Sequence, residues 1–421
     1  MLAYLQEISS SNSAKWYVRG LILSQVESEH DLNFAYLLQK NIFKKLEIPI
    51  VPLFETSQSL LNSCVILEKF FKTNPEILIE HQNRWSSRFE VMVGYSDSGK
   101  ESGILKGRFL IQKSLMMLEK YLSKKKLVPI YFHGSGGSIE RGGGTIQEQT
   151  SWWPTSSLNN YKCTIQGEMI ARSFMSSPIF LSQINQINKS FLISQNNKKD
   201  KDNISEDKNF ENFCMEVGKN YETLIHDPNF VKNIVDATPY NFLDILKIGS
   251  RPTKRQTEGF KLRAIPWILC WTQTRLLLPT WIGVGPAFKS LSHQNKLKLR
   301  KTYQTNFMFR SYIHQLGFTL KKVELSIWYH YLLNKTQNKA QAEILFKPFE
   351  IEFNETIKFF KFITQEKNLT FYRPWLGESI YFRSSMIHPL NLIQMEAVNR
   401  KDELLLRETV TGISCGMMTT G

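Results

Sequence analysis

The sequence predicts a mostly helical α/β fold, in which part of an α/β barrel is followed by a large helical bundle. In the first third of the chain, short apolar runs alternate with amphipathic helical patterns, an order typical of parallel sheets. From residue 212 onward, helical patterns dominate. The 421 residues are 42% apolar and 22% charged, which allows a sizeable core and excludes a disordered chain or a disulfide scaffold.

The expected strands lie in a first region, residues 1–180, which we interpret as a partial barrel. An extended segment at 16–23 precedes an amphipathic helical pattern at 31–45. Three short apolar runs, each bounded by polar or turn residues, are typical of buried strands and lie at 48–54, 89–93 and 128–132. Helices are predicted at 60–71 and 105–124, between these strands.

Two further regions follow. Residues 181–212 are rich in Asn, Lys, Asp and Ser and are predicted to form a mobile polar insertion. Residues 213–421 are predicted to hold the end of the barrel and the helical bundle, with helices at 212–224, 262–278, 307–334, 348–365 and 389–407. The apolar stretch 263–285 contains Arg263, Arg275 and two prolines, so we expect a buried soluble segment and no membrane span.

The chain is basic, with 53 Lys and Arg against 38 Asp and Glu and a net charge of +15. Such a charge could attract nucleic acid or a membrane surface. The lysines are scattered, however, as an AT-rich genome would also produce, and no recognition motif is present, so neither partner is expected. The five cysteines have no metal-site spacing and no signal peptide precedes them, which predicts reduced core thiols in a cytoplasmic protein.

The glycine-rich segment HGSGGSIERGGG at 133–144 is the strongest local signal. Glycines such as Gly136 and Gly137 let main-chain N–H groups approach an anion, and Arg141 offers a planar pair of donors to phosphate or carboxylate. The spacing fits neither a Walker loop nor a dinucleotide fingerprint. A flexible surface loop is the alternative interpretation.

Charged residues also follow two of the expected strands. Glu55 ends the run at 48–54, and Asp97 and Lys100 follow the run at 89–93. Carboxylates at the carboxyl ends of barrel strands point into a shared active-site mouth, where two of them suit Mg²⁺ or Mn²⁺. Either acid alone could instead cap a helix. A basic cluster around Arg251 could hold a phosphate or form a solvated turn.

Together these segments resemble the phosphoenolpyruvate carboxylase family over its C-terminal half. The matching stretches run in family order: IVPLFET at 50–56, VGYSDSGK at 93–100, FHG at 132–134, QGEMI at 166–170, GSRP at 249–252, LRAIPWI at 262–268, WTQTRL at 271–276 and the closing TG at 420–421. The resemblance implies a (β/α)₈ barrel with a helical C-terminal region, and a homotetramer.

The resemblance also implies an activity: bicarbonate and phosphoenolpyruvate give oxaloacetate and phosphate, feeding the tricarboxylic acid cycle. Bicarbonate attacks the phosphate, and the resulting enolate captures CO₂. In this view Glu55 and Asp97 bind Mg²⁺ or Mn²⁺, and the catalytic residues are the active-site lysine Lys100 together with Arg141 and Arg251. Substrate binding falls to the residues Arg141, Arg251, Arg263, Gly136 and Gly137. Arg141 and Arg383 would belong to an inhibitory dicarboxylate site.

The sequence also departs from the family pattern. Ser135 stands where the family has a phosphate-binding arginine, Glu140 replaces a glycine, and Val235 replaces another arginine. Tyr329 falls at a lysine of the inhibitory site, and Met418 and Thr419 replace the arginine and asparagine near the end of the family's chain.

No motif like the family's Thr-Ala-His-Pro-Thr-Glu, which holds the catalytic histidine in its N-terminal half, occurs in the sequence. A partial barrel would expose strand edges, so we expect the chain to fold poorly alone. Two hypotheses stay open: one half of a split carboxylase whose N-terminal half is a separate chain, or a catalytically impaired remnant that acts as a subunit or binding protein.

Overall fold

The computed structural model describes residues 1–10, 12–135, 145–165, 170, 174–196, 207–243 and 264–417. Within them, four strands form one parallel sheet in the order β1-β2-β3-β4. They are β1 (Leu21–Leu23), β2 (Ile50–Phe54), β3 (Arg88–Gly94) and β4 (Val128–Gly134). Helices make up most of the remaining described chain, so the protein is a helix-rich α/β structure, as predicted.

The helices before residue 208 are α1 (Leu2–Ser9), η1 (Ala14–Trp16), α2 (Glu29–Phe43), α3 (Ser57–Thr73), α4 (Glu76–Arg84), α5 (Ser96–Ser102), α6 (Ile104–Lys124), α7 (Ile146–Thr150), α8 (Thr155–Asn159) and α10 (Ser177–Asn196). Those after it are α12 (Lys208–Ile225), α13 (Pro228–Asn233), η4 (Val235–Ala237), η5 (Pro239–Asn241), α14 (Ala264–Gln273), η6 (Leu278–Thr280), α15 (Val284–Ser290), α16 (His293–Thr305), α17 (Phe307–Lys322), α18 (Leu325–Thr336), α19 (Lys339–Thr364), α20 (Pro374–Arg400) and α21 (Glu403–Gly416).

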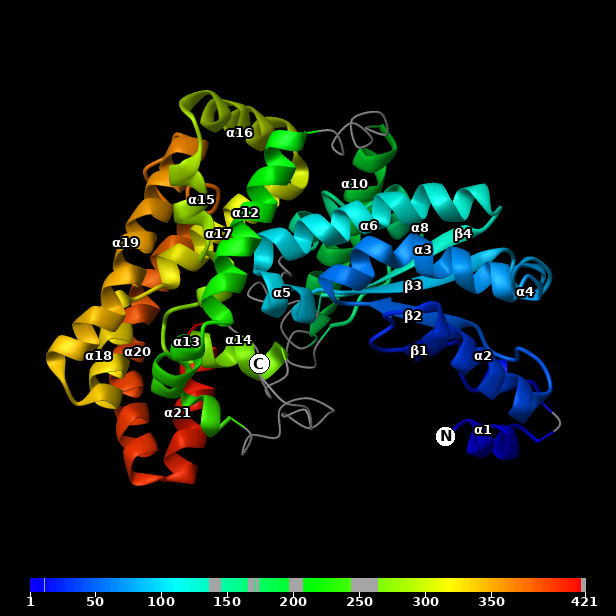
Figure 1. Cartoon of the computed structure of the whole chain (residues 1–421), viewed down its shortest axis with the longest axis horizontal. Coiled ribbons are helices and arrows are strands. Elements are labelled where there is room, and N and C mark those ends of the chain that lie inside the picture. The colour runs from blue at the N-terminus through cyan, green and yellow to red at the C-terminus, as the bar shows by residue number, and fades with distance from the viewer. Residues whose placement is uncertain are drawn as a thin grey trace.

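The sheet is buried at its centre. All five residues of β2 are buried, as expected for a parallel strand that is covered on both faces. Helices α2, α3 and α6 pack beside the strands, and α5 continues from the end of β3 toward the helical region (Figure 1). The carboxyl ends of the strands therefore point toward α12 and α14, both of which contact α5.

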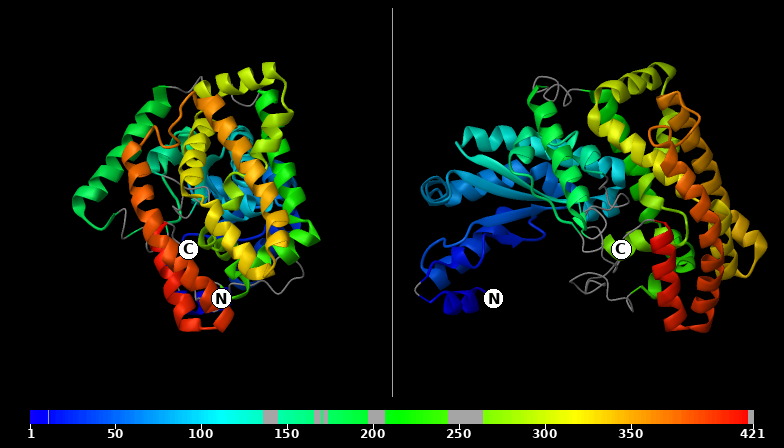
Figure 2. Two further views of the ribbon diagram at one scale, coloured as in Figure 1. Left: turned by 90° about the vertical axis from the view of Figure 1, so that its left-hand side faces the viewer. Right: turned by 180° about the vertical axis from the view of Figure 1, so that it is seen from behind.

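The α/β region and the helical region share one large hydrophobic core. Its members run from Val26 to Val410 and include four fully buried tryptophans of the second region, Trp267, Trp271, Trp281 and Trp328. Figure 2 shows the long helices α19 and α20 on the side of the molecule away from the sheet. The interface between the two regions is thus a continuous core.

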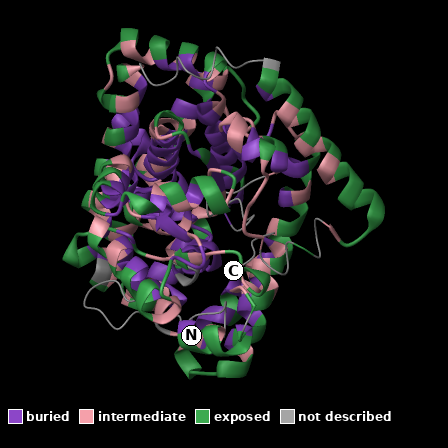
Figure 3. Ribbon diagram, turned by 90° about the vertical axis from the view of Figure 1, so that its right-hand side faces the viewer, coloured by how far each residue is buried: buried purple, intermediate pink, exposed green. Residues whose placement is uncertain are grey.

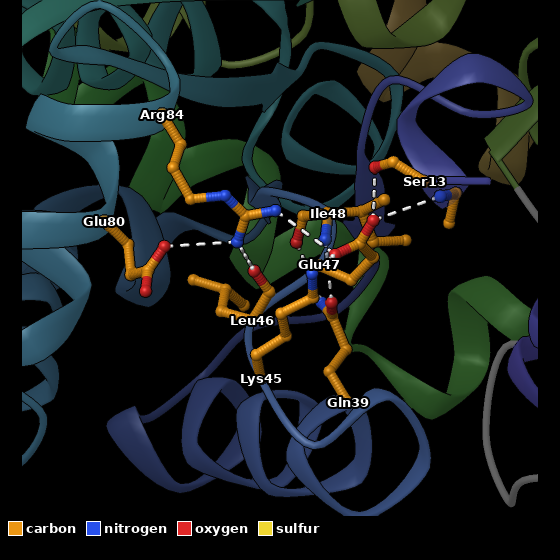
Figure 4. A network of polar contacts seen from close by, with 9 residues as sticks. Ser13, Gln39, Lys45, Leu46, Glu47, Ile48, Glu80 and Arg84 are labelled. Atoms are coloured by element: carbon orange, nitrogen blue, oxygen red, sulfur yellow. Dashed lines mark hydrogen bonds and ion pairs between the residues drawn. The ribbon is translucent and has the colours of Figure 1, made fainter. Parts of the chain in front are cut away.

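A buried carboxylate fixes the N-terminal segment. Glu47 is 3% exposed and accepts hydrogen bonds from the Ser13 hydroxyl and from the Ala14 main-chain N–H at 3.1 Å (Figure 4). Lys45 and Arg84 form ion pairs with it at 3.0 and 3.2 Å. Burial would raise the pKa of Glu47, but the Ser13 hydrogen bond and the cations outweigh burial and lower it. The ionised form of Glu47 therefore ties η1 to α4.

Several helix boundaries differ from the prediction. The helix expected at 307–334 is two helices, α17 and α18, because the Arg275 guanidinium bonds the Lys322 carbonyl at 3.1 and 3.2 Å and ends α17. The expected starts near Pro348 and Pro389 are wrong: both prolines lie inside the long helices α19 and α20.

Other expectations can be compared directly. The first part of the predicted polar insertion is helical, since α10 runs to Asn196; the mobility of this segment stays a prediction. Residues 267–285 of the apolar stretch are buried, as expected. No described helix has the length and apolar character needed to cross a membrane. The five cysteines are free, but Cys415 is exposed and is not the core thiol that was expected.

Candidate active site

The candidate site begins with the register of the neighbouring strands β2, β3 and β4. Phe54 of β2 pairs with Val93 of β3, and Val93 pairs with His133 of β4. The next position along each strand brings Glu55, Gly94 and Gly134 to one edge of the sheet. The glycine-rich segment begins at this same edge, with Gly134 at the end of β4. Glu55 and the start of the glycine-rich segment therefore lie at one edge of the sheet.

Glu55 lies against the end of β3. Its side chain is 8% exposed, and its Oε1 accepts a hydrogen bond from the Gln25 main-chain N–H at 3.1 Å. A Cβ atom at Gly94 would lie 2.5 Å from the Cβ of Glu55, which no real side chain tolerates. Glycine at position 94 therefore lets Glu55 reach over the end of the neighbouring strand.

Asp97 and Lys100 lie on α5, the short helix that follows β3. Asp97 is in its first turn, where a negative charge is favoured, and Lys100 follows one turn later on the same face. The main-chain carbonyl of Lys100 accepts a hydrogen bond from the Tyr221 hydroxyl at 3.0 Å, and its Nζ lies 6.0 Å from the centroid of the Trp267 ring. Helices α12 and α14 thus position this end of the site.

The donor set suits a hard divalent cation. Glu55 and Asp97 offer carboxylate oxygens from adjacent strand ends, and no group of three or more His, Cys, Asp or Glu side chains that could hold a metal occurs in the described part of the chain. Mg²⁺ typically binds through one or two carboxylates and fills its remaining positions with water and substrate oxygens. The residues therefore fit Mg²⁺ or Mn²⁺ and do not fit a closed structural zinc site.

A buried polar network supports the start of the glycine-rich segment. His133 Nδ1 lies 2.9 Å from the Tyr95 hydroxyl, which accepts a hydrogen bond from Trp153 Nε1 at 3.0 Å. His133 Nε2 lies 3.0 Å from the Ser157 hydroxyl, and its ring stacks on Trp153 with centroids 3.5 Å apart. Burial lowers the pKa of His133 to about 3, so the ring is neutral.

The proton positions in this network follow from the partners. Because the Tyr95 oxygen already accepts from Trp153, its own proton is available for His133 Nδ1, which leaves the imidazole proton on Nε2 for Ser157. His133 is then a positioning residue for Gly134 and Ser135, at the start of the glycine-rich segment. Sequence analysis missed this network; the Trp152–Trp153 pair, eight residues after that segment, was the available signal.

Ser135 and Val235, the two positions at which the resemblance implies an arginine, are both buried. Ser135 is fully buried, and its hydroxyl donates to Gln149 Oε1 at 3.1 Å. Val235, in η4, is 2% exposed and belongs to the main core. Neither side chain is exposed to bind a phosphate.

The remaining candidates are only partly placed. Arg383 is exposed on α20 and donates through Nε to the Ser379 hydroxyl at 3.2 Å. Tyr329, on α18, packs its ring against Phe346. The substrate-binding candidates Arg141, Arg251, Arg263, Gly136 and Gly137 lie outside the described residues, as do Glu140, Met418 and Thr419.

Comparison with known proteins bears on the whole chain. A sequence profile of phosphoenolpyruvate carboxylase matches residues 1–421. Phosphoenolpyruvate carboxylases of Synechocystis sp. and Prochlorococcus marinus are each 30% identical to this chain, over 98% and 100% of its length and 45% and 47% of theirs. The enzyme of Tolumonas auensis is 30% identical over 95% of this chain and 47% of its own length.

The chain therefore spans about half the length of these curated relatives. The family match covers every segment that builds the candidate site, from β2 to the helical region. The chain belongs to the phosphoenolpyruvate carboxylase family.

Proposed function

We propose that this chain supplies the metal-binding and phosphate-facing half of a phosphoenolpyruvate carboxylase active site. The reaction joins phosphoenolpyruvate and bicarbonate and releases oxaloacetate and phosphate. The observation that carries the proposal is the convergence of Glu55, Asp97, Lys100 and the glycine-rich segment at one edge of a parallel sheet. In parallel α/β folds this edge is where active sites lie.

Each described residue has a role in this proposal. Glu55 and Asp97 would hold Mg²⁺ or Mn²⁺, which supplies charge stabilisation for the phosphate and the developing enolate. Lys100 adds a positive charge beside them, and the neutral His133 holds the loop that carries Arg141. Arg251 and Arg263 would bind the substrate anion, and Arg141 with Arg383 would bind an inhibitory dicarboxylate.

The proposal also includes a barrel and a complementary half. The parallel order continues beyond β4, because Cys163 forms a parallel bridge with His133. This supports a (β/α)₈ barrel that is completed by the other half of the relatives' length, either within a longer polypeptide or as a separate chain. Residues 1–180 and 213–421 would then be the barrel portion and the helical portion, and the assembly would be tetrameric.

A second candidate function rests on Ser135 and Val235. Loss of two phosphate-binding guanidinium groups costs roughly 2–5 kcal/mol each when such contacts are buried. With both replacements buried, the chain could instead act as a non-catalytic subunit that binds the substrate anion weakly.

The deciding experiment measures oxaloacetate with a coupled dehydrogenase in the presence of phosphoenolpyruvate, bicarbonate and Mg²⁺. The chain is assayed alone and after assembly with an N-terminal carboxylase half that carries the catalytic histidine. We expect activity only in the assembly. A soluble, monodisperse assembly without activity would reject the carboxylase proposal and favour the non-catalytic subunit.

A further inference from the structure

One cavity of the described structure is lined by none of the residues proposed for the active site. Its volume is about 350 Å³, at the small end of the range for ligand sites. We call it the α7–α17 pocket, because α7 and α17 form its floor while α10 and the residues just before α20 form its walls. Its polar and aromatic lining includes Glu148, Arg310, Ser311, His314, Tyr372 and Arg373.

The one carboxylate of the lining is already neutralised. Glu148 Oε1 forms an ion pair with Arg373 Nη2 at 3.1 Å, and its Oε2 accepts hydrogen bonds from the main-chain N–H and the hydroxyl of Thr145 at 3.1 and 3.0 Å. Glu148 therefore caps α7, and its negative charge is paired with the positive charge of Arg373.

Arg310 has a different environment. Its Nε donates to the Tyr303 carbonyl at 3.3 Å and its Nη2 to the Gln304 carbonyl, both at the end of α16, and no carboxylate of the described residues pairs with it. Its Nη1 donors are not used by those two carbonyls, so they can serve a ligand. The guanidinium carbon lies 5.3 Å from the Phe307 ring centroid, which holds the charge beside an apolar wall.

A third arginine, Arg108, lies outside the lining and contacts the lining residue Ser311. Arg108 is 2% exposed, and its Nη1 lies 3.4 Å from the Ser311 hydroxyl, which is part of the lining. Burial lowers the pKa of Arg108 to about 10, so it stays protonated at neutral pH. Arg373 offsets Glu148, so Arg310 in the lining and Arg108 behind it leave the described surroundings of the cavity with a net positive charge.

The rest of the lining is flat or apolar. The His314 and Tyr372 rings stack with centroids 4.2 Å apart and planes 7° apart, and Ile193 lies on α10 opposite them. Burial lowers the pKa of His314 below its usual range, so it adds no fourth charge. Helix α10 is largely exposed, as the green helix on the right of Figure 3 shows, and Ile193 itself is 46% exposed.

We propose that the α7–α17 pocket binds a small organic carboxylate with a flat apolar body, whose anionic group meets Arg310 and whose body lies against the stacked His314 and Tyr372 rings. This inference does not depend on the proposed carboxylase function, because none of the residues that line the pocket is proposed to bind the metal or the carboxylase substrates.

The probe is benzoate, with the neutral isostere benzamide as its matched partner. Ligand-observed NMR and calorimetry are run on the full chain, alone or assembled with the complementary half. We expect saturable benzoate binding and much weaker benzamide binding. Arg310→Gln should weaken benzoate binding roughly tenfold to a hundredfold, since a charge-assisted hydrogen bond is lost. Ile193→Trp should block binding while leaving the charge unchanged.

Arg400→Gln is the matched control, because Arg400 is an exposed arginine on α20 that pairs with Glu396 outside the pocket. Equal binding of benzoate and benzamide, an equal loss in Arg400→Gln and Arg310→Gln, or no binding at millimolar benzoate would each overturn the proposal. Circular dichroism of each variant separates lost binding from lost folding.

Discussion

The two sides of the candidate active site differ in how their residues are used. On the acidic side, Glu55, Asp97 and Lys100 follow β2 and β3 and gather at the sheet edge. The other side we call the basic side, because the resemblance implies an arginine at positions 135 and 235. There Ser135 is buried against Gln149, and Val235 is part of the core. The acidic side therefore has carboxylates, Glu55 and Asp97, that are proposed to bind a metal. On the basic side, the described side chains of Ser135 and Val235 pack inside the protein.

The resemblance implies an arginine at both positions, and the burial of Ser135 and Val235 bears on packing as well as on charge. The Ser135 hydroxyl is satisfied inside the protein by Gln149. Both side chains are enclosed by their neighbours. Restoring one arginine would therefore not restore a phosphate-binding contact.

The largest expected effect is on the basic side. Val235→Arg places a charge in the core and should destabilise the chain by several kcal/mol, with a lower urea midpoint or loss of soluble protein. Asn229→Arg adds the same charge at an exposed position nearby and should change little. A stable Val235→Arg variant with raised activity would instead mean that the position opens to the site.

The next effect tests the acidic side. Asp97→Asn should lower oxaloacetate formation by the assembled enzyme roughly a hundredfold to a thousandfold, the usual result of removing one preorganised electrostatic group. It should also weaken Mn²⁺ binding in calorimetry. Glu101→Gln is the control, because Glu101 lies on the same helix and accepts from Ser57 N at 2.9 Å. Equal losses in the two variants would remove Asp97 from the proposed metal site.

A smaller effect tests the geometry of the acidic side. Gly94→Ala should cost about 1–3 kcal/mol of stability and weaken Mn²⁺ binding, because the new methyl group displaces Glu55. At Gly99 a Cβ would meet only the flexible end of Ile104 at 2.8 Å, so Gly99→Ala should be tolerated better. Unchanged metal binding in Gly94→Ala would show that the position of Glu55 is not critical.

The smallest expected effect is that of a substitution at Ser135, on the basic side. Ser135→Ala removes one buried hydrogen bond to Gln149 and should cost about 1 kcal/mol in urea unfolding. Activity of the assembled enzyme should not change, since the hydroxyl faces away from the site. Ser385→Ala, at an exposed residue of α20, is the comparison. A clear loss of activity in Ser135→Ala would show that the hydroxyl contacts substrate after all.

The sequence was sufficient for the three longer strands and for placing Glu55, Asp97 and Lys100 just after β2 and β3, whereas their role in metal and substrate binding stays a prediction. The short apolar runs that end at Glu55 and Gly94 are typical of buried parallel strands. Parallel strands bring the residues that follow them to the same edge of the sheet. The burial of Ser135 could not be predicted, because it depends on Gln149, which lies 14 residues further along the chain. The break between α17 and α18 depends likewise on the distant Arg275.

The contact between Tyr221 and the carbonyl of Lys100 has a consequence for the order of folding. The two residues are 121 positions apart, and the neighbouring Lys106–Glu222 ion pair, at 2.5 Å, joins α6 to α12 in the same way. During synthesis, β3 and α5 emerge well before the segment that holds them in place. Contacts of such long range form slowly, so the lysine of the site should settle only after α12 has docked.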